Sequence, residues 1–430
     1  MSHSRNQRMR LSAALALPVA GVLALSGCAS GGGGDTAGGG ATEFSLTYAT
    51  SNNLENPYEA LANAYMEANP DVTITLNPQP NDRYGETLRT QLQAGNAPDV
   101  IQTAPGSGQG QAVLSLGEAG FLAPLGETAS GVIPDGSEAL YTYEDQVLAQ
   151  PVDFTVAGFV YSNSSAEAAG VTSYPADTAE LIGKCGDLTS QGKSMIVIAG
   201  AAGPNTGMTA MSISATRVYA ETPDWNEQRE AGDVTFADSQ GWKDTLETII
   251  DLKDAGCFQP GAEGAGFDVI TNNITQGTSL GGFLPGSSAN ELAEANPDLD
   301  FSIEPFPSAD GGKPYVLASS NYSLSINAAS DKQEAAQAFL DWVAGDEGAK
   351  LFSDVSGALP VSGIENYEFE GSAYASVEQV LVDGSYTPLP NSLWPNQAVY
   401  DELQKGVQGL FTGQTTVDGV LSAMDAAWDS

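Results

Sequence analysis

Residues 44–101 read FSLTYATSNNLENPYEALANAYMEANPDVTITLNPQPNDRYGETLRTQLQAGNAPDVI and carry the clearest periodicity in the chain. Residues 44–48 and 72–76 alternate apolar with polar side chains, as half-buried strands do, and a third strand opens at the end of the stretch. The two segments between the strands follow helical spacing and stop at Pro70 and at Gly95. This order predicts an α/β fold with a largely parallel sheet that is covered by helices on both faces.

Polar and turn-forming residues follow the first and third of these strands. They are Thr50, Ser51 and Asn52 after the first strand, and Gln102, Pro105 and Ser107 after the third. Ligands of such sheets bind beyond the carboxyl ends of the strands, so we expect these residues to contact a ligand. The expectation rests on position alone, because the same residue types are ordinary turn formers.

The N-terminus has the composition of an export signal. The first ten residues hold three arginines and no acid, and residues 11–25 form an apolar run shorter than the roughly 20 residues that span a bilayer. The run ends in Leu25-Ser26-Gly27-Cys28, which resembles a bacterial lipobox, and residues 28–42 then form a Gly-rich tether. Residues 1–27 are therefore expected to be a lipoprotein signal peptide. The lipid on Cys28 would anchor the protein to the outer face of the cell membrane, whereas an ordinary signal peptide that contains a cysteine is the alternative.

Cleavage before Cys28 would remove His3, the one histidine of the chain. Without histidine, the mature chain has no histidine-dependent triad, no histidine general base and no histidine-ligated metal. The sequence also lacks a GxxxxGK[ST] loop and a calcium-binding loop. We expect a protein that is not an enzyme and that uses no cofactor and no metal, although enzymes that avoid histidine stay open.

The two cysteines beyond the lipobox are Cys185 and Cys257, an even pair in an oxidising compartment. A disulfide between them is the expected state, and two buried free thiols are the alternative.

The mature chain is strongly acidic. The signal contains three of the 15 basic residues and none of the 54 acids, so the mature charge is 12 minus 54, or −42. Such a field repels nucleic acid and anionic lipid, which leaves the lipid on Cys28 as the only expected membrane attachment.

The run from Tyr84 to Leu88, followed by Gln91 to Val100, resembles the signature of family 1 extracellular solute-binding proteins, the maltose-binding-protein-like group. The similarity continues in chain order at 120–125, 161–163, 169–175, 335–340, 359–360 and 413–417. It covers nearly all of residues 43–428. The joint order of these segments behind a lipobox makes the resemblance fairly specific.

The resemblance implies a periplasmic-binding-protein-like fold with two α/β lobes, a ligand cleft between them and more than one hinge crossing. Lobe 1 would comprise residues 43–151 and 306–344, and lobe 2 residues 152–305 and 345–430. The protein would be a monomer that captures a solute by hinge closure and delivers it to an ABC importer, whose permease and ATPase are separate chains.

The resemblance also points to further candidate ligand contacts. Trp394 falls where the family places a stacking aromatic, and Asp153 falls where it often has an acidic sugar ligand. Asn205, Phe283, Asn321 and Tyr322 complete the set. Many relatives have a tryptophan in place of Phe283, which argues against a long oligosaccharide. The alternatives are a core tryptophan at Trp394, a solvated hinge acid at Asp153, a plain turn at Asn205 and an inward strand residue at Tyr322.

A carbohydrate is the expected solute, because sugar rings stack on aromatic side chains and sugar hydroxyls bind Asp, Asn and Gln. A polyamine or an iron complex is the second hypothesis. A cationic solute would need several converging acids, and the candidate set contains only Asp153. A histidine-free glycosidase, with two carboxylates roughly 5 to 10 Å apart, is a remote third hypothesis.

Overall fold

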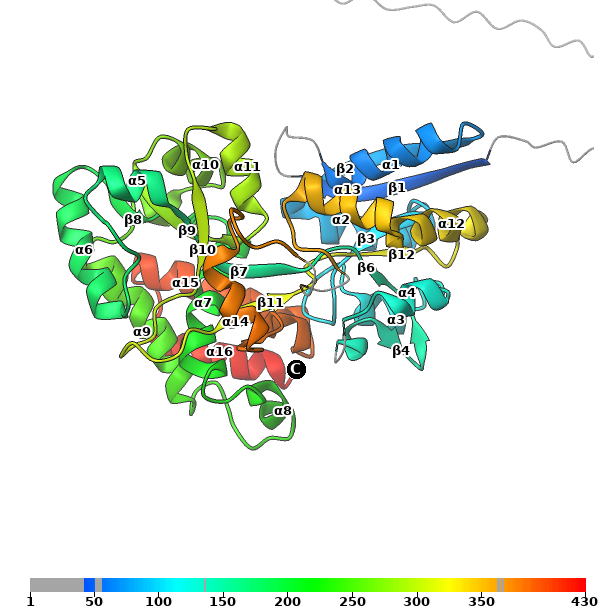
Figure 1. Ribbon diagram of the computed structural model, residues 1–430. Helices are drawn as coiled ribbons and strands as arrows, with labels where there is room; N and C mark the ends of the chain where they lie inside the picture. Colours follow the sequence, from blue (N-terminus) through cyan, green and yellow to red (C-terminus); the bar gives the residue numbers. More distant parts are fainter. Residues whose placement is uncertain (1–41, 51–55, 135–136, 362–363, 365–366) are drawn as a thin grey trace, which may run out of the picture. The chain divides into compact units, whose positions relative to one another are not determined.

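The computed structural model describes residues 42–50, 56–134, 137–361, 364 and 367–430 (Figure 1). The predicted lipidation site Cys28 and the predicted ligand contacts Ser51 and Asn52 lie outside these residues. The described elements form two main sheets, each with its own helices. We call the elements around the five-stranded sheet lobe 1 and those around the six-stranded sheet lobe 2.

The sheet of lobe 1 has the strand order β2-β1-β3-β12-β6. Its strands are β1 (Thr42–Thr50), β2 (Val72–Pro80), β3 (Val100–Thr103), β12 (Ser323–Ile326) and β6 (Gln150–Pro151). The first three are parallel, whereas β12 runs antiparallel to both β3 and β6. The helices are α1 (Pro57–Ala68), α2 (Tyr84–Ala94), α3 (Val113–Glu118), α4 (Glu127–Gly131), α12 (Gln333–Ala344) and α13 (Asp346–Ser356), and a hairpin joins β4 (Thr142–Tyr143) to β5 (Gln146–Val147).

The first five elements confirm the predicted order of strands and helices. Helix α1 begins after Asn56, whose side chain accepts a hydrogen bond from the Tyr58 backbone N–H, and α2 ends at Gly95, whose φ of 71° suits glycine. Asp99 then ties the unit together. Its Oδ2 accepts hydrogen bonds from the backbone N–H and the hydroxyl of Ser45, each at 2.7 Å, so the start of β3 is fixed against β1.

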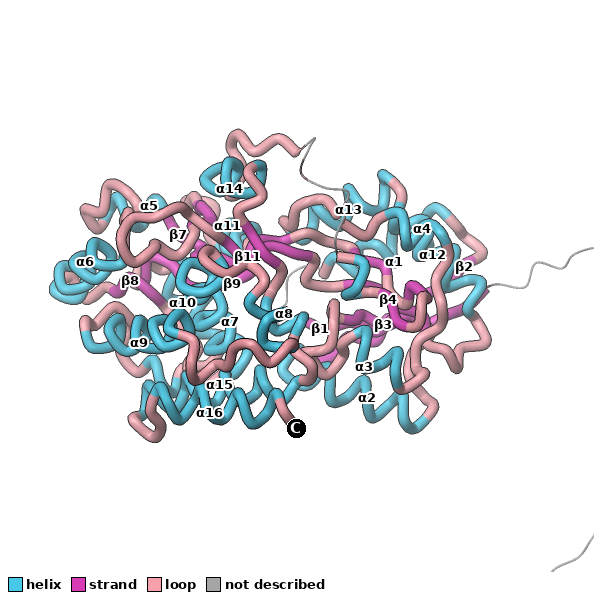
Figure 2. Tube along the Cα trace, turned by 90° about the horizontal axis from the view of Figure 1, so that it is seen from below, coloured by secondary structure: helices cyan, strands magenta, loops and turns pink. Residues whose placement is uncertain are grey.

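The sheet of lobe 2 has the order β13-β11-β7-β9-β8, and β10 also pairs with β7. Its strands are β7 (Thr155–Ser162), β8 (Ser194–Ile196), β9 (Ser279–Pro285), β10 (Phe301–Glu304), β11 (Val316–Ser319) and β13 (Tyr386–Thr387). The helices are α5 (Asn163–Ala168), α6 (Thr178–Ser190), α7 (Gly203–Ser214), α8 (Trp225–Glu230), α9 (Gln240–Asp254), α10 (Asp268–Thr275), α11 (Ser288–Ala295), α14 (Glu378–Val382), α15 (Gln397–Thr412) and α16 (Val417–Trp428). Helices α9, α15 and α16 contact one another along one side of the lobe (Figure 2).

Lobe 2 contains the one disulfide among the described residues. Cys185 on α6 and Cys257 just after α9 are joined, with their Cα atoms 4.8 Å apart, and both residues are fully buried. This bond confirms the expected pairing and excludes the alternative of two free thiols in this structure.

The chain passes between the lobes three times, at residues 152–154, 320–322 and 357–359. The second and third crossings lie further along the chain than expected from the sequence. Residues 306–319 belong to lobe 2, because β11 pairs with β7, and 345–356 belong to lobe 1, because α13 packs against α1 and α12. Each boundary is set by a partner far away in the chain, which local periodicity does not report.

None of the helices in the described part of the chain is long and apolar enough to cross a membrane.

Candidate functional site

The three crossings meet at Asp153 and Phe154. The backbone of Phe154 exchanges two hydrogen bonds with Leu359 of the third crossing, at 3.1 and 2.8 Å. The side chain of Asp153 binds the second crossing: its Oδ1 accepts hydrogen bonds from the Ser320 hydroxyl at 3.1 Å and from the Asn321 and Tyr322 backbone N–H groups at 3.0 Å each. A single carboxylate therefore connects two segments that are about 170 residues apart in the sequence.

Asp153 is only 4% exposed. Burial raises the pKa of its carboxyl group to about 6, against the lowering effect of the three hydrogen bonds from the second crossing. The group is thus mostly ionised at neutral pH, although burial makes that ionisation costly. A buried carboxylate with a shifted pKa at a hinge between two lobes is a typical functional-site candidate.

The charge of this carboxylate acts on tyrosine side chains from both lobes. They are Tyr58 on α1, Tyr141 just before β4, Tyr322 in the second crossing and Tyr374 before α14. Burial is the main cause that raises the pKa of each hydroxyl, and the negative charge of Asp153 adds to it in all four. The pKa of Tyr322 rises to about 12, so these hydroxyls stay protonated and can donate hydrogen bonds.

Several buried side-chain polar atoms near the crossings lack a hydrogen-bond partner. Oε1 of Gln150 and the Thr155 hydroxyl flank the first crossing, and two further atoms lie one in each lobe. One is the hydroxyl of Tyr58 in lobe 1, and the other is Oδ1 of Asn391 in the segment that precedes α15 in lobe 2. Tyr58 is 3% and Asn391 2% exposed. Buried polar groups normally have a partner, so each of these atoms is a place where a ligand or a water molecule could bind.

Of the residues predicted from the sequence, Asp153, Asn321 and Tyr322 come together at the crossings. Ser107 reaches lobe 2, where its hydroxyl donates to the Trp394 carbonyl and its backbone N–H donates to the Ser392 carbonyl at 3.1 Å. The structure places Thr50 half-buried at the end of β1 and Pro105 buried after β3.

Gln102 and Asn205 hold their own lobes together. Oε1 of Gln102 accepts a hydrogen bond from the Ala49 backbone N–H at 2.6 Å within lobe 1. Asn205 accepts from the Ala199 N–H at 2.8 Å and donates to the Phe283 carbonyl at 3.0 Å within lobe 2. Both side chains are buried, and their contact with a ligand stays a prediction.

The predicted aromatic contacts Phe283 and Trp394 are also buried. Phe283 is 1% exposed and lies against Phe159 and Phe306. Trp394 is fully buried, with ring contacts to other aromatics of lobe 2, and its indole N–H donates to Asn226 at 3.3 Å. The position of Trp394 matches the core alternative, so its role as a stacking surface stays a prediction.

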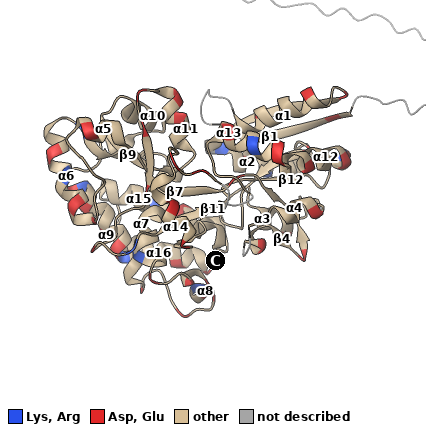
Figure 3. Ribbon diagram, in the orientation of Figure 1, with Lys and Arg blue, Asp and Glu red and all other residues tan. Residues whose placement is uncertain are grey.

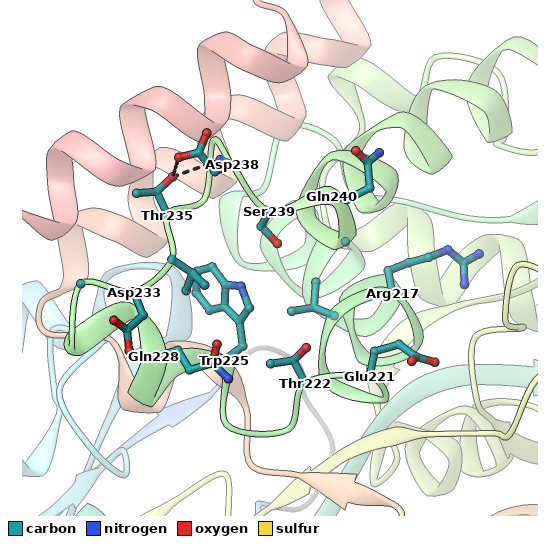
Figure 4. Close-up of a pocket in the computed structure, with 14 residues that line it drawn as sticks. Arg217, Glu221, Thr222, Trp225, Gln228, Asp233, Thr235, Asp238, Ser239 and Gln240 are labelled. Carbon is teal, nitrogen blue, oxygen red and sulfur yellow. Dashed lines mark hydrogen bonds between the residues drawn. The ribbon is translucent and has the colours of Figure 1, made fainter.

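A hollow on the described surface lies elsewhere. It measures about 450 Å³ and is lined by lobe 2 alone, between the π-helical turn Ala215–Tyr219, α8 and the start of α9 (Figure 4). The side chain of Arg217 extends away from its centre, and the ring of Trp225 forms part of its wall (Figure 4). None of the sequence-predicted ligand contacts lines this hollow, so we place the candidate site at the crossings.

Acidic side chains are spread over both lobes (Figure 3). The described residues contain no group of three or more His, Cys, Asp or Glu side chains that could hold a metal ion. The negative charge is therefore a property of the surface and is not concentrated at the crossings.

Sequence reasoning missed Tyr58, Tyr141, Tyr374 and Asn391. Tyr58 opens the helix after the first strand, so a search that included the first turn of that helix would have found it. Asn391 lies shortly before the predicted contact Trp394 in the sequence. No local pattern marks Tyr141 or Tyr374, because only the fold brings them near Asp153.

Comparison with known families gives a match over most of the chain. The family described as bacterial extracellular solute-binding protein matches residues 51–350, more than half of the chain. Among curated protein sequences, no match to the chain was found.

Several solved structures share the fold. A protein named RafE, in complex with raffinose, has a TM-score of 0.74 and 18% identity over 90% of this chain and 99% of its own. A sugar transporter protein from Bacillus licheniformis, in complex with stachyose, has a TM-score of 0.73 and 16% identity over 90% of this chain and 98% of its own. A solute-binding protein from Thermotoga lettingae, bound with alpha-D-tagatose, gives 0.73 and 18% over 90% and 99%. At these identities the likeness concerns the fold.

Proposed function

This chain belongs to the family of bacterial extracellular solute-binding proteins, and from that membership we propose that it captures a carbohydrate between its lobes and delivers it to an ABC importer. The solute would bind at the crossings, and hinge closure would present the loaded form to the permease. The sugars named in the related structures agree with this solute class.

The observation that carries the proposal is the buried Asp153 carboxylate among tyrosine side chains from both lobes. A carboxylate accepts hydrogen bonds from sugar hydroxyls, and tyrosine offers both a ring face for C–H groups and a hydroxyl. All three hydrogen bonds from the second crossing end on Oδ1 of Asp153, which makes Oδ2 the natural acceptor for a solute.

We assign the solute contacts in two groups. Asp153, Asn321, Tyr322 and Ser107, together with the newly found Tyr58 and Asn391, would touch the solute. Thr50 and Pro105 stay candidates by their position at the ends of β1 and β3, and Ser51 and Asn52 stay candidates by their position in the sequence alone. Gln102, Asn205, Phe283 and Trp394 would support the site from inside their lobes, because their side chains are engaged or enclosed there.

The alternative of a cationic solute has one observation in its favour. The charge of Glu291 on α11 also raises the pKa of Tyr322, so a second acid lies in this region. We prefer a neutral sugar, because Asp153 is the only acid that also adds to the pKa of Tyr58, Tyr141 and Tyr374.

A hydrolytic role is disfavoured on electrostatic grounds. In glycosidases that use two carboxylates, the neighbouring acid helps to raise the pKa of its partner. The raised pKa of Asp153 comes from burial, and no second carboxylate contributes to it. We therefore propose binding without catalysis.

The remaining parts of the proposal concern the membrane. The lipid on Cys28 would hold the mature, monomeric protein at the outer face of the membrane, and a separate permease and ATPase would supply transport. Metabolic labelling with a tritiated fatty acid tests the anchor, since Cys28→Ala should abolish the label.

A thermal-shift panel of neutral sugars, polyols, polyamines and peptides tests the solute class. A solute that binds only the folded protein raises its melting temperature in proportion to the logarithm of its concentration. We expect at least one neutral sugar to do so and the polyamines to have no such effect. Stabilisation by a polyamine with none by any sugar would replace the carbohydrate proposal with its alternative.

A further inference from the structure

Apart from the three crossings, the described parts of the two lobes meet in two places. Asn290 on α11 donates a hydrogen bond to the Val355 carbonyl on α13 at 3.4 Å, and the loop after β3 touches the segment before α15. The Ser107 backbone N–H donates to the Ser392 carbonyl at 3.1 Å, and the Ser107 hydroxyl donates to the Trp394 carbonyl. Ser392 is 2% exposed and Ser107 is half-buried.

Glycine allows the two backbones to approach this closely. A Cβ atom on Gly106 would lie 1.7 Å from the Ser392 carbonyl oxygen, and one on Gly108 would lie 1.8 Å from the Asn391 carbonyl oxygen. Both distances are far below any real Cβ contact, and the obstructing atoms are backbone, which cannot turn aside. Any side chain at these two positions would hold the lobes apart.

The lobes share no apolar core that would make this contact permanent. The described residues form four apolar clusters, of which two lie in lobe 1 and two in lobe 2, and none combines the two lobes. The loop contact consists of hydrogen bonds and close backbone packing, and water replaces such hydrogen bonds at a net cost of about 1 kcal/mol each. The contact can therefore open and close.

We propose that Gly106, Ser107 and Gly108 form a docking contact with Asn391 and Ser392 that is made when a solute is held, and that glycine at 108 determines how far the lobes close. This inference rests on the proposed function, because it assigns residues to the closure step of solute capture. The docking segment also contains the buried, unpartnered Asn391 Oδ1.

Gly108→Ala is the cleanest variant for a test. The φ of Gly108 lies outside the left-handed range, so alanine adds a clash with Asn391 without backbone strain, whereas Gly106 has a φ of 71° and would add both. Gly131→Ala, at the end of α4 in the same lobe, is the matched control, since a Cβ there meets nothing within 4 Å. Calorimetric titration with a sugar that binds the wild type should show at least about tenfold weaker binding for Gly108→Ala and no change for Gly131→Ala.

The outcomes separate the two proposals. If no sugar binds the wild type, the proposed function is refuted, and the hydrogen-exchange experiment on the solute-free protein still tests the docking contact. If a sugar binds the wild type and Gly108→Ala binds it equally well, the docking inference is overturned and the proposed function stands.

Amide hydrogen exchange of the wild-type protein gives a test that needs no variant, and its first measurement needs no solute. The Gly106 N–H bonds to the Leu140 carbonyl within lobe 1 at 2.9 Å, whereas the neighbouring Ser107 N–H bonds to lobe 2. Without solute, Ser107 should exchange about tenfold faster than Gly106, and a bound sugar should remove the difference. Equal protection of both amides in the solute-free protein would mean a permanent contact and would overturn the inference.

Discussion

Oδ1 of Asp153 accepts a hydrogen bond from the Tyr322 backbone N–H at 3.0 Å, and this bond joins the first chain crossing to the second. The same oxygen also accepts from Ser320 and Asn321, so one atom fixes the geometry of both segments. Burial makes the charged form of Asp153 costly, so the protein would be more stable with a neutral side chain at this position. The chain nevertheless has a carboxylate here. This conflict between stability and function leads to the first two predictions.

The Asp153→Asn variant should bind its sugar about tenfold to a hundredfold more weakly than the wild type. The reason is that a hydrogen bond to a charged acceptor contributes roughly 1.5–3 kcal/mol and asparagine is neutral. Calorimetric titration at pH 7.5 measures the effect. Unchanged affinity would exclude Asp153 from the solute contacts.

The same substitution should not destabilise the solute-free protein at pH 7.5. The folded-state pKa of about 6 lies above the ordinary 3.8, so the folded state binds the proton more tightly than the unfolded state does. This contribution to stability is fully present below about pH 4 and is lost as the pH rises through about 6, a change of at most about 3 kcal/mol. The wild type should thus gain stability relative to Asp153→Asn between pH 7.5 and pH 5. Urea unfolding of both proteins at the two pH values isolates this group, because the other acids cancel in the difference.

Removal of the disulfide should weaken lobe 2 and leave binding intact. Cys185 and Cys257 are 72 residues apart, and closing a loop of that length stabilises a fold by roughly 4 kcal/mol in the chain-entropy model. The double variant Cys185→Ser, Cys257→Ser should lose about this much unfolding free energy in urea and keep its sugar affinity at 20 °C or below. A reducing agent should destabilise the wild type similarly and have no effect on the double variant.

Arg229→Met should be strongly destabilising. The Arg229 side chain is 7% exposed, its Nη2 lies 2.9 Å from Asp429 and its Nε 3.4 Å from Asp425, and its guanidinium covers the Trp428 ring. Loss of this buried cation should cost about 3 kcal/mol and loosen α16. Lys405→Met is the control, because the Lys405–Glu402 pair is largely exposed and should change stability by no more than about 0.5 kcal/mol. Similar losses for both variants would refute a buried structural role for Arg229.

Trp394→Phe separates the two interpretations of this residue. If the ring only fills the core of lobe 2, the variant should lose roughly 2 kcal/mol of stability and keep its sugar affinity within about threefold. A tenfold loss of affinity would instead support the stacking contact expected from the sequence. Urea unfolding and calorimetric titration of the same sample distinguish these results.

The local elements of the fold could be predicted from the sequence because their signals are local. The strand at 44–48, the helix that stops before Pro70 and the helix that stops at Gly95 all appear where periodicity and stop signals place them. The disulfide followed from counting cysteines once Cys28 was assigned to the lipid.

The site was harder to predict, because its contacts join distant residues. The resemblance pointed to Asp153, Asn321 and Tyr322, which the fold brings together, and their contact with a solute stays a prediction. Whether a selected side chain faces a solute or the interior depends on pairs such as Asn205 with Phe283 or Trp394 with Asn226, which are 78 and 168 residues apart. The second crossing was expected too early for a similar reason, since residues 317–319 pair with β7 in lobe 2.

The position of β12 in the lobe 1 sheet has a consequence for the order of assembly. This strand lies between β3 and β6, yet Ser323 pairs with Thr103, 220 residues earlier. Most of lobe 2 lies in the intervening chain, so the sheet of lobe 1 stays incomplete until that whole segment has been made. Such long-range pairing slows folding. During export from the N-terminus, lobe 1 would emerge first and finish late, and its unpaired β3 edge would be the surface most in need of protection by a chaperone.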